Sequence, residues 1–326
     1  MAMKYRTLPG TDLQLSAVGF GCWAIGKLWW GDGIDDDESI AAVHAALDHG
    51  INWFDTAPLY GHGHADELLV RALGPRRKDV IIATKVGVRW DNDGVHARSD
   101  LSPAYIQADT EASLRRLGLD AIPLLQVHWP CEEGTPLADT LDALTRLRAQ
   151  GKIRHFGLCN YDAATLREAR RLAPIASLQT PYSMVRREFE GALLDVVAPQ
   201  TEDGGRTQEL GVLAYEPLCR GLLTGKFKTP PRLPDSDLRA RDDRFKEPAF
   251  SQIRALTRAI EFVSKRLGAP PAAVAIGWVC AQPGVSVAIA GAKTARQVAQ
   301  NVQAAELVTR RKVWEALASH VNAVRV

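Results

Sequence analysis

The 326-residue sequence has few of the features that mark secreted, membrane or metal-binding proteins. Its five cysteines form no CxxC pair, so neither a zinc knuckle nor a disulfide framework is predicted. No apolar run approaches the roughly 18 residues of a membrane helix, and residues 1–10 lack the charged-then-apolar layout of a signal peptide. We therefore expect a cytoplasmic protein with no membrane partner.

The sequence also lacks a concentration of charge of one sign. Its 40 Lys and Arg balance 38 Asp and Glu to a net charge of +2, and no basic run reaches five residues. This distribution gives no electrostatic footprint for nucleic acid, so we expect small-molecule partners and a monomer or weak oligomer. No nucleophile elbow, Walker loop or HExxH pattern occurs, and Gly19-Phe-Gly21 does not continue into a GxGxxG motif.

Short apolar segments alternate with helical patterns along the chain. Strands are predicted at 18–21, 52–56, 80–85, 122–128, 153–159, 177–182, 211–215 and 286–290, and helices at about 35–50, 65–73, 102–117, 137–150 and 163–172. Strand-helix units of about 30 residues imply right-handed crossovers and a parallel sheet. Eight such strands predict an α/β fold, a (β/α)8 TIM barrel that forms one domain over residues 1–326. An open doubly wound sheet is the alternative, which the missing GxGxxG disfavours.

Four further segments depart from this alternation. Residues 4–18 read as a hairpin that plugs the bottom of the barrel, and 311–324 as an extra amphipathic helix laid across it. Residues 225–249 are polar and rich in Pro, Arg and Asp, which is typical of a lid. Residues 199–208 make a poor helix interior, so helix six is expected to be short or interrupted.

Ionisable residues end three consecutive strands. Asp55, Lys85 and His128 close strands two, three and four, and Tyr60 lies on the loop after Asp55, so all four are expected at the carboxyl-end mouth of the barrel. An ammonium beside Tyr60 would lower the phenol pKa, Asp55 would hold that ammonium, and a neutral His128 could donate to a substrate carbonyl oxygen. An ordinary buried Asp–Lys pair is the alternative.

Such a cluster has no reducing power of its own, so we expect a bound cofactor to supply a hydride. The candidate cofactor clamp is Ala290-Gly291-Ala292-Lys293-Thr294, followed by Gln297 and Asn301 on a helix. Backbone amides at a helix N-terminus together with a lysine suit a phosphate, although the same residues could form a plain strand-to-helix turn.

The chain resembles the aldo-keto reductase superfamily over nearly its full length. The motifs that carry this resemblance are Gly19-Phe-Gly21, Trp53-Phe-Asp55-Thr-Ala57, Tyr60-Gly61, Ala83-Thr-Lys85, Leu125-Gln-Val-His128-Trp-Pro130, Gly157-Leu-Cys-Asn160 and the 290–301 clamp. The resemblance implies reduction of aldehydes or ketones with NADPH/NADP+ and a catalytic tetrad of Asp55, Tyr60, Lys85 and His128. It implies that Asn160 and Gln179 hold the nicotinamide carboxamide, that Tyr215 stacks on the ring, and that Leu218, Gly221 and Leu222 follow the pyrophosphate. The full set of implied cofactor-binding residues is Gly21, Cys22, Trp23, Asp55, Cys159, Asn160, Gln179, Tyr215, Glu216, Leu218, Cys219, Gly221, Leu222, Gly291, Lys293, Gln297 and Asn301.

Within that superfamily, the Leu-Cys-Arg-Gly-Leu-Leu run looks most like the bacterial general-stress-protein-type branch. Cys159 and Glu216 stand where serine is usual, and 199–208 is unlike the usual helix six. Two other functions stay open: a metal-dependent TIM-barrel hydrolase, prompted by His62, His64 and Asp66, and a non-catalytic NADP(H)-binding regulatory protein. A hydrolase would need metal ligands at strand ends, and no metal is predicted.

Five of the eight tryptophans fall on loops that follow barrel strands: Trp23, Trp29, Trp30, Trp90 and Trp129. They predict a substrate pocket that prefers apolar or aromatic carbonyl compounds, although some could instead fill small cores beneath the loops. Four cysteines, Cys22, Cys131, Cys159 and Cys219, follow strands at the same mouth. Cys219, beside Arg220, is the candidate reactive thiol, and buried packing is the alternative.

Overall fold

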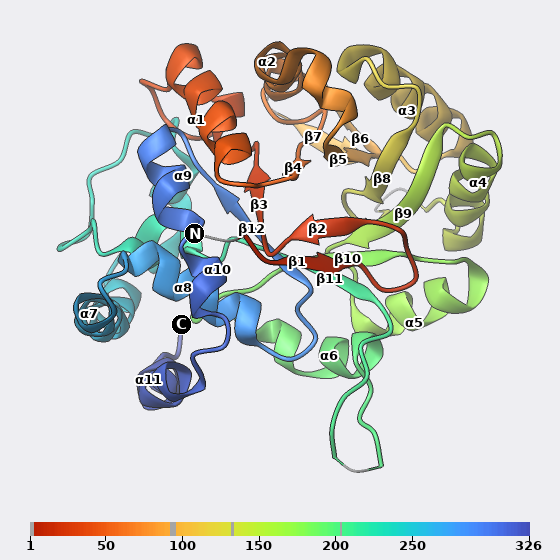
Figure 1. Cartoon of the computed structure of the whole chain (residues 1–326). Helices are drawn as coiled ribbons and strands as arrows, with labels where there is room; N and C mark the ends of the chain where they lie inside the picture. Colours follow the sequence, from red (N-terminus) through yellow and green to blue (C-terminus); the bar gives the residue numbers. More distant parts are fainter. Residues whose placement is uncertain (1–2, 92–95, 132–133, 203) are drawn as a thin grey trace.

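A closed parallel barrel forms the centre of the structure. The computed structural model describes residues 3–91, 96–131, 134–202 and 204–326, and within them the strands close in the order β10-β11-β12-β3-β4-β5-β8-β9 (Figure 1). The barrel strands are β3 (Val18–Gly21), β4 (Trp53–Asp55), β5 (Ile81–Val86), β8 (Ile122–Val127), β9 (Ile153–Cys159), β10 (Ser177–Pro181), β11 (Gly211–Tyr215) and β12 (Val287–Gly291). The predicted (β/α)8 fold class is confirmed.

Helices surround the barrel on its outside (Figure 1). They are α1 (Asp36–Asp48), α2 (His64–Leu73), α3 (Pro103–Leu117), α4 (Leu137–Ala149), α5 (Ala163–Leu172), α6 (Ala192–Val197), α7 (Ala249–Leu267), α8 (Pro271–Ala281), α9 (Ala295–Asn301), α10 (Ala304–Leu307) and α11 (Arg311–Ala323). Local sequence sets their ends: the Ser102 side chain caps α3, Pro103 occupies its first turn, and Gly118 ends it in a left-handed conformation. Among the described residues, no helix is both long and apolar enough to cross a membrane.

The amino-terminal hairpin closes the bottom of the barrel, as predicted. Strands β1 (Tyr5–Thr7) and β2 (Gln14–Ser16) pair in antiparallel fashion, and Leu8, Leu13 and Leu15 join the barrel-interior cluster that contains Trp53. The Arg6 guanidinium donates to the carbonyl oxygens of Cys280, Val285 and Ser286 beneath β12. The floor is therefore closed by side chains, which leaves the opposite, carboxyl-end face for a site.

Helix α6 is short, as expected, but three other elements were not anticipated. An antiparallel hairpin of β6 (Val88–Trp90) and β7 (Ala97–Ser99) follows β5. Two helices, α7 and α8, follow the long polar loop in succession. Helix α11 buries Trp314, Leu317 and Val321, and it packs on α7 outside the barrel instead of lying across it (Figure 1).

The long polar loop reaches over the carboxyl-end face of the barrel. It contains the short helical turns η5 (Leu238–Arg241) and η6 (Asp243–Phe245). The Leu238 amide donates to the Trp29 carbonyl oxygen at 2.9 Å, and Trp30 forms an antiparallel bridge with Asp237. The loops that follow β3 and β11 are thereby joined over the mouth.

Candidate active site

Lys85 lies at the centre of the predicted tetrad. Its ammonium donates to Asp55 Oδ2 at 2.8 Å, to the Thr56 carbonyl oxygen at 3.0 Å and to the Tyr60 hydroxyl at 3.3 Å. Lys85 is 1% exposed and Asp55 3%, so the pair is held in a low-dielectric environment. The register of the parallel strands explains the encounter: Asp55 pairs with Ala83 on β5, two residues before Lys85 on the same face of that strand.

Burial and charge set the protonation of these groups. Burial raises the pKa of the Tyr60 phenol, and the nearby Lys85 ammonium offsets only part of that rise. Lys85 thus lowers this pKa as expected, but burial is the larger effect and the pKa of Tyr60 lies above its ordinary value. Burial lowers the pKa of Lys85, but the negative charge of the Asp55 carboxylate outweighs burial, so that pKa lies above its ordinary value. The site holds a protonated phenol beside a protonated amine.

His128 completes the cluster immediately after β8. Its imidazole is 8% exposed, and burial together with the Lys85 charge lowers its pKa well below the ordinary range, so it is neutral at physiological pH. The Tyr60 and His128 rings meet edge to face with centroids 6.0 Å apart, and Trp23 stacks on the other side of Tyr60 at 6.2 Å. The phenol and a neutral N–H donor thus face one cavity, which suits a carbonyl oxygen.

That cavity has a volume of about 750 Å³ and runs across the carboxyl-end face. Trp23, Trp29, Trp30 and Trp129 line it, in agreement with the predicted substrate pocket. Trp90 is not among the residues that line the cavity. It stacks on His62 with ring centroids 4.9 Å apart, so Trp90 packs under its loop, which was the alternative to a role in the substrate pocket.

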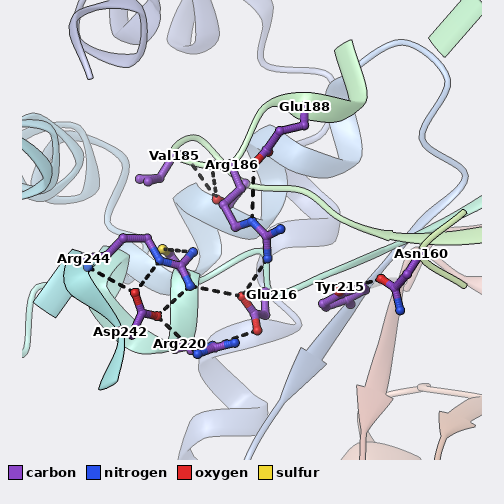
Figure 2. Close-up of polar contacts among 11 residues, drawn as sticks. Asn160, Val185, Arg186, Glu188, Tyr215, Glu216, Arg220, Asp242 and Arg244 are labelled. Atoms are coloured by element: carbon purple, nitrogen blue, oxygen red, sulfur yellow. Dashed lines mark hydrogen bonds and ion pairs between the residues drawn. The ribbon is translucent and has the colours of Figure 1, made fainter. Parts of the chain in front are cut away.

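The residues assigned to the nicotinamide end contact one another in this structure. Gln179 donates to Asp55 Oδ1 at 2.8 Å, and Asn160, with a left-handed φ of 64°, donates to the His128 carbonyl oxygen at 3.1 Å. The Tyr215 hydroxyl donates to Asn160 Oδ1 at 2.8 Å (Figure 2). All three line the cavity beside the tetrad.

The loop after β11 is shaped by left-handed backbone. Glu216, Cys219, Arg220 and Gly221 have φ values of 55°, 48°, 53° and 96°. Glu216, Leu218, Arg220 and Gly221 line the cavity, whereas Cys219 and Leu222 are buried behind it. Glu216, at the position where the family resemblance led us to expect serine, forms ion pairs with Arg186, Arg220 and Arg244. This corner of the cavity therefore carries a cluster of charged side chains (Figure 2).

The far end of the cavity is cationic. Gly291, Lys293, Gln297 and Asn301 line it as predicted; Thr294 caps α9, and the Lys293 amide donates to Gln297 Oε1 at 2.7 Å. Four further cations belong to the cavity lining: Lys226, Lys228, Arg239 and Arg296. They were not predicted from the sequence, because the long polar loop and the first turn of a helix give no periodic signal.

This cationic end is built for an anion. Burial lowers the pKa of Lys226 to about 8, with Arg239 and Lys293 as further causes, because like charges oppose its protonation. The indole Nε1 of Trp30, which lies against Arg239 and Lys293, is buried and has no hydrogen-bond partner among the described residues. Cations that repel one another and an unpartnered donor fit a phosphate-bearing ligand.

None of the four cysteines assigned to the mouth lines the cavity, and Cys131 alone among them is partly exposed. Cys22, Cys159 and Cys219 are at most 1% exposed, and burial raises the pKa of each thiol. The Cys219 Sγ accepts from Arg244 at 3.4 Å. Reactivity needs exposure and thiolate character, so the hypothesis that Cys219 is a reactive thiol is wrong, and the alternative of buried packing holds.

The histidine pair that prompted a hydrolase is also engaged elsewhere. His62 stacks on Trp90, and His64 Nε2 contacts Asp36 Oδ1 at 3.0 Å. Asp66 is fully buried, where it accepts from the Thr56 hydroxyl at 2.5 Å and from Arg116 at 2.7 Å. Within the part of the chain that the structure describes, no group of three such side chains is arranged to hold a metal.

A parallel barrel with Tyr, Lys, Asp and a neutral His at its carboxyl ends defines an oxidoreductase that acts on carbonyl groups. The profile of the Aldo/keto reductase family matches residues 17–322, and the chain belongs to that family. It is therefore an enzyme of nicotinamide-dependent carbonyl reduction.

Named relatives agree with this assignment. Aldo-keto reductase YhdN of Bacillus subtilis is 35% identical over 299 residues, which cover 91% of this chain and 87% of the relative. The NADH-specific methylglyoxal reductase of Escherichia coli is 32% identical over 315 residues, 93% of each chain. Among solved structures, the glycerol dehydrogenase AKR11B4 from Gluconobacter oxydans has a TM-score of 0.83 at 37% identity, covering 98% of this chain and 97% of its own.

Proposed function

We propose that the protein reduces aldehydes and ketones to alcohols with NADPH, and that Tyr60 is the general acid. The observation that carries this proposal is the triple contact of Lys85 with Asp55, Thr56 and Tyr60 beside a neutral His128. When bound, the nicotinamide supplies the hydride. The chain's own residues bind the carbonyl oxygen, keep water away and move one proton.

In this proposal Tyr60 starts protonated and ends by giving its proton to the substrate oxygen. Its raised pKa keeps the proton in place until negative charge develops on that oxygen. The Lys85 ammonium then stabilises the phenolate that remains, and Asp55 fixes the ammonium through the 2.8 Å contact. General acid catalysis of this kind contributes about 10²–10⁴ in rate.

His128 orients the substrate in this proposal. A neutral imidazole donates one hydrogen bond to the carbonyl oxygen, and it adds no second proton source to compete with Tyr60. Burial keeps it neutral, because the charged form would lie close to the Lys85 ammonium in a site shielded from water.

The proposed cofactor residues divide the cavity into two parts. Asn160, Gln179 and Tyr215 would hold the nicotinamide. To do so, the Gln179 side chain would replace its hydrogen bond to Asp55 with one to the nicotinamide carboxamide. The loop of 216–222 and the 291–301 segment would hold the phosphates. Of the remaining implied residues, Gly21 and Trp23 line the cavity; Cys22, Cys159, Cys219 and Leu222 would support it from behind.

NADPH is the proposed cofactor in preference to NADH. The cationic end carries Lys226, Arg239, Lys293 and Arg296, and such a set favours the additional 2′-phosphate of NADPH. The relatives differ on this point: one from Schizosaccharomyces pombe is named for NADP(+), and the one from Escherichia coli is NADH-specific. The preference for NADPH over NADH is therefore proposed from the positive charge at this end of the cavity.

Small carbonyl compounds are the proposed substrates. The cavity tryptophans offer apolar surface to a carbon skeleton, and the names of relatives refer to methylglyoxal and glycerol. A cytoplasmic location, a single domain over 1–326, a monomeric or weakly associating state and membership of the general-stress-protein-type branch stay predictions.

The test follows the loss of NADPH absorbance with 4-nitrobenzaldehyde as substrate. The proposal predicts turnover that requires both NADPH and the aldehyde. Binding of NADPH without turnover would instead indicate a regulatory protein. Hydrolysis of an ester that is stopped by chelators would indicate a metal-dependent hydrolase.

A further inference from the structure

We propose that Asp66 is a positioning residue for the proton transfer: through the Thr56 hydroxyl it fixes the carbonyl group that aims the Lys85 ammonium at Tyr60. Asp66 touches neither substrate nor cofactor in this proposal, and it acts through Thr56 and Lys85. The inference rests on the proposed role of Tyr60 as the general acid, and it extends that role to a residue on a helix outside the barrel.

The Lys85 ammonium has three N–H groups, and all of them are used. They donate to Asp55 Oδ2 at 2.8 Å, to the Thr56 carbonyl oxygen at 3.0 Å and to the Tyr60 hydroxyl at 3.3 Å. The donors leave one nitrogen in fixed relative directions, so two well-placed acceptors determine where the remaining N–H points. The Thr56 carbonyl is therefore one of two groups that set the Lys85–Tyr60 contact.

Thr56 is the first residue beyond β4, and its backbone leaves the sheet there. Its amide still donates to the Ala83 carbonyl oxygen on β5 at 2.9 Å, whereas its own carbonyl turns to the Lys85 side chain. The strand pairing thus holds only one side of this residue. The direction of its carbonyl needs a second anchor.

Asp66 supplies that anchor from the first turn of α2. Its Oδ1 accepts from the Thr56 hydroxyl at 2.5 Å, and its Oδ2 accepts from Arg116 Nε on α3 at 2.7 Å. Thr56 and Asp66 are fully buried, and a hydrogen bond to a carboxylate that is paired with an arginine is strong in such surroundings. Thr56 is therefore tied to two helices behind the strand ends.

Helix α3 also anchors the strand that carries Lys85. The Asp109 carboxyl group on α3 accepts from the Gly87 amide at 3.1 Å, and Gly87 follows directly after β5. Arg116 lies on the same helix. The helix therefore holds both strands beside the tetrad, β5 through Asp109 and the end of β4 through Arg116 and Asp66.

A loosened Thr56 carbonyl would change the chemistry of Tyr60 and leave the shape of the cavity intact. Lys85 would keep its charge and its contact with Asp55, but it would stabilise the Tyr60 phenolate less well. Tyr60 would then be a weaker acid in reduction, and in the reverse reaction it would lose its proton only at higher pH. Neither Thr56 nor Asp66 lines the cavity, so the contacts to substrate and cofactor stay in place.

The experiment removes the Thr56 hydroxyl and leaves the Thr56 carbonyl in the chain. In Thr56→Val we expect kcat for 4-nitrobenzaldehyde to fall about tenfold or more, because small displacements of catalytic groups have effects of this size. The pH profile of 4-nitrobenzyl alcohol oxidation with NADP+ should shift to higher pH by about half a unit or more, since the phenolate is less stabilised. The Kd of NADPH should change less than about threefold.

The pH profile isolates Tyr60 from the other groups that titrate. The charged or titratable groups that face Tyr60 are Lys85, Asp55, His128 and Cys159. None of them is altered in the variants. The profile is recorded above pH ~7, where the Asp109 carboxyl group, whose pKa burial raises to about 6, is ionised.

Thr84→Val is the matched control. Thr84 is fully buried and precedes Lys85 on β5, but its hydroxyl has no hydrogen-bond partner among the described residues, so its loss should leave kcat and the pH profile unchanged. Thr56→Ser restores the hydroxyl and should recover most of the loss. Asp66→Asn keeps an acceptor without its charge and should lie between the wild type and Thr56→Val.

Two results would overturn the inference. One is a kcat and a pH profile in Thr56→Val that match those of Thr84→Val. The other is an equal fall of the reduction and oxidation rates with no shift of the profile, which would assign Asp66 to folding alone. If Thr56→Val does not fold, Asp66→Asn carries the test, and an unshifted profile in that variant would refute the role of Asp66. Failure of the wild type to reduce the aldehyde would instead refute the proposed function itself.

Discussion

At the scale of single residues, the environment of each ionisable group decides what it can contribute. Lys85 keeps its proton because Asp55 faces it, and Tyr60 keeps its proton because it is buried. Adjacent cysteines in the same region are buried thiols. The sequence placed the tetrad correctly from strand ends, but exposure depends on the packing of distant segments and could not be predicted for Cys219.

The pKa of Lys226 gives a prediction for cofactor binding. Because that pKa is lowered to about 8, Lys226 is charged below this pH and neutral above it. A bound phosphate favours the charged form, so we expect the Kd of NADPH to rise above pH ~8, by up to about tenfold per pH unit. Fluorescence titration of NADPH between pH 6 and about 10 measures this.

Lys226→Met should remove that dependence and weaken NADPH binding at neutral pH. Lys246→Met, at an exposed lysine that pairs with Asp243 outside the cavity, serves as the matched control and should keep the wild-type profile. A wild-type Kd that stays flat across pH 8 would show that Lys226 does not contact the phosphates.

Lys293 should discriminate between the two nicotinamide cofactors. We expect Lys293→Ala to raise the KM for NADPH about ten- to a hundredfold, since a charge-assisted contact contributes about 1.5–3 kcal/mol. The KM for NADH should be nearly unchanged. Steady-state kinetics with both cofactors measures this. Equal losses would mean that Lys293 only supports the loop, through its 3.3 Å bond to the Trp30 carbonyl oxygen.

At the scale of elements, the loop after β4 places Tyr60 through a close approach of two glycines. Gly61 has a φ of +64°, and a Cβ there would lie 2.2 Å from the Gly26 carbonyl oxygen. We expect Gly61→Ala to destabilise the protein by about 1–3 kcal/mol and to lower kcat, because the loop must move and carries Tyr60 with it. Chemical denaturation and turnover measure the two effects.

Gly10→Ala is a matched control for Gly61→Ala. Gly10 has a φ of +70°, but a Cβ there would meet no atom within 4 Å. It should carry only the backbone strain of about 1–2 kcal/mol and keep the wild-type kcat. If both variants lost the same stability and neither lost activity, the close approach at Gly26 would not position Tyr60.

Element by element, the sequence predicted periodic segments well and irregular ones poorly. The bounds of β9, β11 and α5 agree with the prediction to the residue, because each is a clear apolar or amphipathic segment between turn signals. Helix α8 was missed because its apolar residues surround it, so no stripe marks it as a helix. Lys226 and Arg239 were missed because an irregular loop reveals no direction for its side chains.

At the scale of the whole molecule, the barrel is sealed below and open above. Leu8, Leu13 and Leu15 close the floor, and the 750 Å³ cavity occupies the opposite face. This separation means that stability and activity can be changed independently, as is usual in parallel barrels.

We expect one cooperative unfolding transition over the whole chain, which follows from the proposal of a single domain. Tryptophan fluorescence and far-UV circular dichroism should give coincident denaturation curves. Leu13→Ala, at the fully buried floor, should shift both curves by about 2–5 kcal/mol and leave kcat unchanged. Two separate transitions would contradict the single domain.

The most direct measurement of the central claim is the turnover of Tyr60→Phe. This variant keeps the ring that stacks on Trp23 and loses only the hydroxyl that meets Lys85 at 3.3 Å. The account predicts that reduction of 4-nitrobenzaldehyde falls by about 10²–10⁴ while the Kd of NADPH, from fluorescence titration, is nearly unchanged. A Tyr60→Phe enzyme that keeps more than about a tenth of wild-type turnover would contradict the assignment of Tyr60 as the proton donor.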